Sequence, residues 1–177
     1  MSLPMRLVAA VLRLIREPRM ATPERARRRM AEPKTPARPP AWLVRRHDVS
    51  SREVEGLPVW TVAPRRRTAG RAAVYLHGGA YTTAISPQHW ALAGALADAG
   101  VRVELPLYGL APEHTYREAY PFVTAVYRQL LAEVTADAVT LAGDSAGGGL
   151  TLGLAQTLEA QGCRSPGGWS CSPPGWT

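Results

Sequence analysis

Cysteine is nearly absent from the sequence, and so are long uninterrupted apolar runs. Of the 177 residues only Cys163 and Cys171 are cysteines, and no histidine lies near them at metal-ligand spacing, which argues against a disulfide framework or a zinc site. The apolar segment 7–15 is interrupted by Arg13, lacks a cleavage site and is too short to span a bilayer. We therefore expect a cytoplasmic protein, with no membrane contact and no metal or cofactor.

Features of nucleic-acid-binding proteins are also missing, although the net charge is +7. Residues 1–71 contain 17 Lys or Arg against 6 Asp or Glu, whereas residues 72–177 contain 4 against 8. The positive charge is thus confined to the N-terminal part, and its arginine-rich stretches have no interleaved aromatic residues and no zinc-finger, RRM or helix-turn-helix pattern. Nucleic acid is not an expected partner, and nothing in the sequence specifies an oligomeric state.

Residues 1–40 are predicted to form an amphipathic helix followed by a proline-rich linker. A helix that ends near residue 18 is indicated by apolar residues at helical spacing: Leu3, Leu7, Val11, Leu14 and Ile15. Such a helix can cover a pocket of its own protein or lie on a membrane, and we favour the pocket. Prolines recur too often between residues 32 and 40 for a helix or a strand, which indicates a linker.

From residue 41 onward the predicted strands and helices alternate. Short β-like runs come first, around Val54 and at 58–62, and residues 72–76 form a continuous apolar strand. Helices are expected at 90–99, 121–134 and 150–159, with strands at 101–107 and 138–142 between them. This alternation predicts an α/β fold with a mostly parallel sheet and helices on both faces.

The strongest functional motif is Gly143-Asp144-Ser145-Ala146-Gly147, which lies between an apolar strand and an apolar helix. A nucleophile elbow needs a serine on a sharp strand-to-helix turn, with very small residues two positions before and after it. Free N–H groups at the start of the following helix can stabilise a developing oxyanion. A glycine-rich turn or a phosphate cradle can use the same N–H groups, but a P-loop also needs a lysine, and none is nearby.

A second glycine cluster occupies residues 77–81 and follows the apolar strand 72–76. A loop there can supply N–H donors opposite Ser145, because glycines such as Gly78 and Gly79 let the backbone approach a substrate closely. We interpret His77 as a residue that orders this loop by a hydrogen bond, rather than as a proton carrier.

Three motifs in this order, at 74–81, 108–114 and 143–148, resemble the hormone-sensitive-lipase-like (GDXG) family of α/β-hydrolase esterases. The likeness covers about residues 1–162. It implies a partial α/β-hydrolase fold with an N-terminal helical cap, and hydrolysis of small acyl esters with short or medium chains. It also implies that Ser145 is the nucleophile and that the amides of Gly78, Gly79 and Ala146 form the oxyanion hole. The supporting motif residues are His77, Ala80, Gly143, Asp144 and Gly147.

Two positions depart from the pattern of that family. Ala80 stands where a third glycine is common, and Gly109 stands where the family usually has arginine. We expect Ala80 to be tolerated unless its backbone angle φ is positive, because a Cβ makes positive φ unfavourable.

Two members of the expected catalytic triad are missing from the sequence. In this fold an Asp or Glu and then a His follow the nucleophile along the chain, but the only carboxylate side chain after Ser145 is Glu159, and all four histidines precede Ser145. Without a base the hydroxyl is a poor nucleophile, so we expect the chain as written to be inactive. The alternatives are a non-catalytic remnant that binds an acyl ligand or a partner, and an unstable product of a pseudogene.

Residues 163–177 have no apolar periodicity at the point where the family has its next strand. Read one base out of frame, the possible codons allow the string LPVPGGLVLLSPWLD, which resembles that strand and the loop after it. We hypothesise a frameshift near codon 162, either biological or introduced in sequencing. Residues 41–162 are then the N-terminal part of the hydrolase domain, and 163–177 are an aberrant tail that leaves an open sheet edge.

Overall fold

The computed structural model describes residues 22–65, 70–163 and 166–172. The chain divides into two compact units, residues 1–34 and 35–177. The first unit contains helix α2 (Pro23–Met30), and the helix expected around residues 3–15 lies outside the described residues. Residues 33–40 form neither helix nor strand, as expected for a linker. None of the described helices is long and apolar enough to cross a membrane.

The second unit is built on a six-stranded sheet with the order β1-β2-β4-β3-β5-β6. Its first edge is a hairpin, in which β1 (His47–Val54) pairs antiparallel with β2 (Leu57–Pro64). The second strand also pairs antiparallel with β4 (Val101–Pro106). The two short β-like runs of the sequence therefore become one hairpin at the edge of the sheet.

The rest of the sheet is parallel. Strand β3 (Arg71–Leu76) lies between β4 and β5 (Val139–Asp144), and β5 pairs with β6 (Gly168–Ser172). The carboxyl ends of β3 and β5 therefore lie next to each other at one edge, with Leu76 opposite Gly143. This arrangement brings the two glycine clusters of the sequence to the same place.

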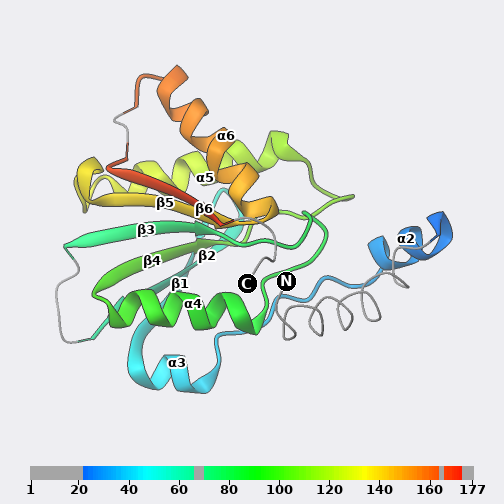
Figure 1. Cartoon of the computed structure of the whole chain (residues 1–177), viewed down its shortest axis with the longest axis horizontal. Helices are drawn as coiled ribbons and strands as arrows, with labels where there is room; N and C mark the ends of the chain where they lie inside the picture. The colour runs from blue at the N-terminus through cyan, green and yellow to red at the C-terminus, as the bar shows by residue number, and fades with distance from the viewer. Residues whose placement is uncertain (1–21, 66–69, 164–165, 173–177) are drawn as a thin grey trace, which may run out of the picture. The chain divides into compact units, whose positions relative to one another are not determined.

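One face of the sheet is covered by α3 (Ala41–Arg46) and α4 (Pro87–Asp98) (Figure 1). Trp90 and Ala93 of α4 are fully buried in this layer, together with Tyr75 of β3. The strand residue next to it, Val74, points to the other face, because successive side chains of a strand alternate between faces.

The opposite face is covered by α5 (Tyr116–Leu130) and α6 (Ala146–Ala160) (Figure 1). Their apolar side chains, such as Phe122 and Leu154, form the larger core cluster with strands β3 and β5. Apolar residues that recur at helical spacing gather on one face of each helix, and that face packs against the sheet. The prediction of a mostly parallel sheet with helices on both faces is confirmed.

Strand β6 and helix α5 are among the elements in which the structure differs from the sequence-based expectation. Strand β6 lies in the segment expected to be an irregular tail, and it pairs with β5 from Thr140 to Asp144, so β5 is not the open edge that we expected. Helix α5 begins at Tyr116 rather than at 121. A capping box explains the earlier start, because Glu118 accepts a hydrogen bond from the Thr115 N–H at 2.8 Å.

Candidate active site

Ser145 lies on a strained turn between strand β5 and helix α6. Its backbone angles are φ 50° and ψ −118°, a conformation that a residue with a Cβ rarely adopts. The residue directly after it begins α6, so the serine stands at the N-terminus of a helix whose first amides have no partner within the helix. Backbone strain of this kind often marks a functional residue.

The glycines on either side of Ser145 are required by close packing. A Cβ on Gly147 would lie 1.9 Å from the carbonyl oxygen of Leu76, and a Cβ on Gly143 would lie 2.4 Å from the carbonyl oxygen of Gly147. Both neighbours are backbone atoms, which cannot move aside cheaply. The start of α6 therefore packs directly against the end of β3, and the Thr151 hydroxyl donates to the Gly147 carbonyl at 2.8 Å.

The glycine loop after β3 is joined to the elbow through Asp144. The Gly78 N–H donates to Asp144 Oδ1 at 2.8 Å, and the Tyr75 hydroxyl donates to the same oxygen at 2.6 Å. A Cβ on Gly78 would lie 2.1 Å from Asp144 Oδ2, so only glycine fits there. The third neighbour is His89, whose Nε2 lies 3.6 Å from Asp144 Oδ1. Burial and the bond to Asp144 raise the pKa of Tyr75, which keeps it a proton donor.

His77 is fixed inside the protein beside this carboxylate. Its Nδ1 lies 2.8 Å from the Gly78 carbonyl oxygen. Because a carbonyl oxygen can only accept a hydrogen bond, Nδ1 is the donor and carries the proton. Its ring stacks on Tyr108 with centroids 4.6 Å apart, and the Tyr108 hydroxyl donates to the His77 carbonyl. Burial lowers the pKa of His77 to about 4, against the opposing effect of the Gly78 bond. The ring is therefore neutral at pH 7, in keeping with an ordering role for this loop.

The next turn of the loop contains two residues in the left-handed region. Ala80 has φ 54° and Tyr81 has φ 59°, and the Thr82 N–H donates to the Gly79 carbonyl at 3.0 Å. Two consecutive positive φ angles closed by this bond are typical of a type I′ turn, which glycine and asparagine prefer. The condition under which we expected Ala80 to be unfavourable is thus met, and this chain tolerates the strain.

The arrangement of amides changes one expectation about the oxyanion hole. The Gly78 N–H points to Asp144, so it is not free to meet a substrate, and the expectation that it is an oxyanion donor is wrong in this geometry. Within the described part of the chain, the amides of Gly79, Ala80 and Ala146 have no hydrogen-bond acceptor. These three amides are the available donors around the elbow.

A cavity of about 630 Å³ opens beside the elbow. It is lined by side chains that follow the glycine loop, by the start of α5 and by Leu150 of α6. Sequence reasoning missed this cavity, and it also missed Tyr75 and His89 as neighbours of Asp144. These residues are far apart in the chain, and only the folded sheet brings them together. Among the described residues no group of three or more His, Cys, Asp or Glu could hold a metal ion.

Comparison with known proteins agrees with the fold of this chain. A family model described as the alpha/beta hydrolase fold matches residues 73–176, so the likeness continues beyond residue 162, further than expected. An acetyl-hydrolase of Streptomyces hygroscopicus is 39% identical over 115 residues, which is 64% of this chain and 38% of that protein. An ethyl acetate hydrolase of Pseudomonas putida is 38% identical over 122 residues, again 64% of this chain and 38% of that protein.

A solved esterase from the bacterial hormone-sensitive lipase family superposes with a TM-score of 0.68 at 27% identity. The match covers 84% of this chain and 54% of the solved one. The chain thus matches little more than half of the solved esterase and less than two fifths of the two curated relatives. The resemblance to hormone-sensitive-lipase-like esterases is confirmed.

Proposed function

Because this chain belongs to the α/β-hydrolase fold family, with hormone-sensitive-lipase-like esterases as its relatives, we propose that it carries the nucleophile of a carboxylic ester hydrolase. The observation that supports this most is the strained conformation of Ser145 at the start of α6, with φ 50°. A serine lifted on such a turn exposes its hydroxyl in front of free backbone amides. The substrates are small esters with short or medium acyl chains.

In the proposed reaction Ser145 Oγ attacks the carbonyl carbon of the ester and loses its proton to a base. The carbonyl oxygen becomes an oxyanion, which the amides of Gly79, Ala80 and Ala146 stabilise. When the intermediate collapses, the carbon–oxygen bond to the alcohol breaks, and the alcohol leaves with the proton. Water then attacks the acyl-serine and releases the carboxylic acid.

The base is the part of this mechanism that the described residues do not supply. Among them no side chain hydrogen-bonds to Ser145 Oγ. His77 is bound to the Gly78 carbonyl and is neutral at pH 7, and His89 Nδ1 is engaged by Ser86. A serine without its base loses several orders of magnitude in rate. We therefore propose that the chain as it stands hydrolyses esters very slowly.

The test is hydrolysis of p-nitrophenyl butyrate by the full chain and by a version in which a one-base correction near codon 162 restores the frame. Each is compared with its Ser145→Ala variant, and with Ser50→Ala as a control at an exposed serine of β1. We expect the frame-restored protein to be active, with activity lost in Ser145→Ala and kept in Ser50→Ala. Activity that survives Ser145→Ala would show that another group is the nucleophile.

A second readout does not depend on turnover. Phenylmethylsulfonyl fluoride, which sulfonylates activated serines, is incubated with the frame-restored protein, and the modified residue is located by mass spectrometry. Sulfonylation at Ser145 that is faster than at Ser50 supports an activated hydroxyl. Equal labelling of the two serines in the frame-restored protein would contradict the proposal.

A further inference from the structure

The cavity beside the elbow begins one helical turn from Ser145. The Gly149 N–H donates to the Ser145 carbonyl at 3.3 Å, and a Cβ on Gly149 would lie 2.8 Å from the Tyr81 hydroxyl. Both Tyr81 and Leu150, the residue after Gly149, line the cavity. A group bound there is therefore next to the turn that carries the proposed nucleophile.

Four of the ten residues that line the cavity are tyrosines. Tyr81, Tyr108, Tyr116 and Tyr120 line it, and the rings of Tyr116 and Tyr120 meet edge-to-face with centroids 6.3 Å apart. The Tyr108 ring is held in place by its stack on the His77 side chain. A tyrosine ring can make edge-to-face or offset contacts with another aromatic ring. These contacts are more favourable in free energy than contacts with an aliphatic group that buries the same area.

The lining carries no carboxylate, lysine or arginine among the described residues. The imidazole of His114 is a polar part of the lining. It occupies the space beside Gly109, where a Cβ would lie 2.2 Å from His114 Cγ. The absence of a side chain at residue 109 therefore lets the imidazole sit in the wall. An uncharged occupant fits such a lining, because an ion would lose its hydration without gaining a counter-charge.

We propose that this cavity binds an uncharged aromatic ring, the aryl or benzyl group of an ester substrate. The proposal rests on the proposed ester hydrolysis and narrows its substrate class. The volume of about 630 Å³ is in the range of pockets that hold whole drug-sized ligands, roughly 300–1,000 Å³. An acetyl ester alone would leave most of that space filled with water.

The test measures binding and needs no catalysis. The full chain is titrated with benzyl alcohol, with cyclohexylmethanol as a saturated control of similar size and with sodium benzoate as a charged control, by saturation-transfer NMR. We expect benzyl alcohol to bind roughly two- to tenfold more tightly than cyclohexylmethanol, the factor that aromatic contacts provide. Equal binding of the two alcohols, or tighter binding of benzoate, would overturn the proposal.

Variants show whether the binding is in this cavity. Tyr81→Gly removes one ring at a position whose φ of 59° suits glycine, and Tyr116→Ala removes a ring that is 63% exposed, so both should fold. Each should lower the affinity for benzyl alcohol by at least twofold, whereas Trp42→Ala, which removes an exposed aromatic of α3, should leave it unchanged. Unchanged binding in both tyrosine variants, with folding verified by circular dichroism, would refute the assignment.

The half of the ester that supplies the ring is identified by competition. The Ser145→Ala chain, which cannot turn over by the proposed route, is titrated with benzyl acetate and with ethyl phenylacetate against bound benzyl alcohol. Displacement by benzyl acetate assigns the ring to the alcohol half, and displacement by ethyl phenylacetate assigns it to the acid half. Displacement by neither ester contradicts the proposal. Ring binding without Ser145-dependent hydrolysis by the frame-restored protein would instead leave the cavity assignment standing and refute the proposed function.

Discussion

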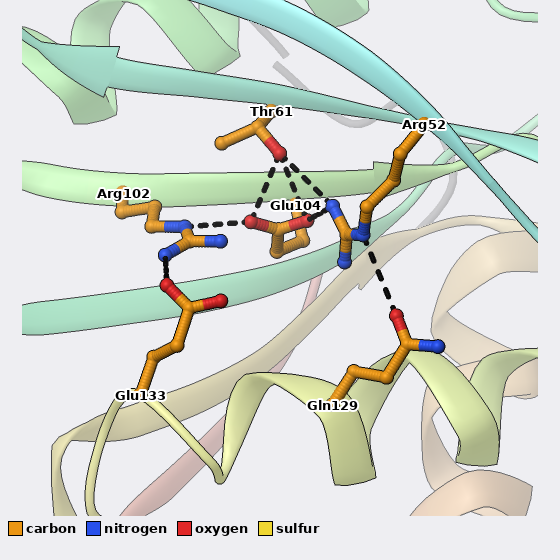
Figure 2. A network of polar contacts seen from close by, with 6 residues as sticks. All are labelled: Arg52, Thr61, Arg102, Glu104, Gln129 and Glu133. Carbon is orange, nitrogen blue, oxygen red and sulfur yellow. Dashed lines mark hydrogen bonds and ion pairs between the residues drawn. The ribbon is translucent and has the colours of Figure 1, made fainter.

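A fully buried carboxylate, Glu104 of β4, holds the edge hairpin to the rest of the sheet. Arg52 Nη1 lies 2.6 Å from one carboxylate oxygen and Arg102 Nε lies 2.7 Å from the other (Figure 2). The Thr61 hydroxyl is 3.1 Å from both oxygens, and Arg102 also pairs with Glu133. Strands β1, β2 and β4 therefore each contribute a side chain to one charged cluster.

We predict that removing the cations of this cluster is more harmful than removing the whole cluster. The double variant Arg52→Leu/Arg102→Leu leaves Glu104, which is 0% exposed, with Thr61 alone as its partner. An uncompensated buried charge costs about 3–5 kcal/mol, whereas replacing a buried ionic group by apolar residues of similar size is often neutral or stabilising. The triple variant that adds Glu104→Leu should therefore recover about 2 kcal/mol or more of the stability lost in the double variant.

The assay is urea unfolding of the full chain, followed by the fluorescence of its tryptophans. Comparable slopes of free energy against urea are needed for the comparison, because a changed slope indicates a changed denatured or native state. Arg46→Leu serves as the control, since it breaks an exposed pair with Asp98 and should cost no more than about 1 kcal/mol. A triple variant that is no more stable than the double variant would refute the reasoning.

Three further results are expected from the geometry of the elbow and its loops. In urea unfolding, Gly147→Ala should lower the free energy of unfolding by more than about 3 kcal/mol, because the new Cβ would overlap the Leu76 carbonyl oxygen. Gly149→Ala should cause a much smaller loss, because its Cβ would meet only the end of the Tyr81 side chain. Ala80→Gly should raise the free energy of unfolding by about 1 kcal/mol, since φ is 54°. As the pH falls from 6.5 to 4, the free energy of unfolding should drop by about 3 kcal/mol because of His77. The pKa of His77 is about 4 in the folded protein and about 6.5 in the unfolded chain, so the unfolded chain takes up the proton first. His77→Gln should flatten that slope in unfolding measured at several pH values.

Local patterns predicted the parts of the fold that depend on neighbouring residues. The glycines at 143 and 147 follow from the small space around a strand-to-helix turn, and the structure shows the backbone contacts that require them. The helices on both faces follow from alternating apolar segments, because such segments can only bury their faces against a common sheet. These inferences need no knowledge of which segments meet.

The parts that were missed depend on contacts between distant segments. Nothing near Gly78 in the sequence shows that its amide turns toward Asp144 rather than toward a substrate, since that orientation is set when β3 and β5 pair. Two of the partners of Glu104, Arg52 and Thr61, come from other strands. Strand β6 was missed for another reason. Its alternation of apolar and polar residues covers only Trp169 to Ser172, and it lies between glycines and prolines that indicate turns. The pairing with β5 reveals it as a strand.

The two strained segments of the candidate site are coupled through one residue. Ser145 is held at φ 50° on the elbow, and Ala80 is held at φ 54° on the glycine loop. Asp144 directly precedes Ser145, and its carboxylate accepts a hydrogen bond from the N–H of Gly78, which lies two residues before Ala80. Strain of this size persists only where the surroundings fix the backbone, so the carboxylate should keep the distance between the serine and the Gly79 and Ala80 amides constant. In the frame-restored protein, Asp144→Ala should therefore slow sulfonylation of Ser145 even where the elbow itself stays folded. Labelling at the unaltered rate would show that the loop holds its position without the carboxylate.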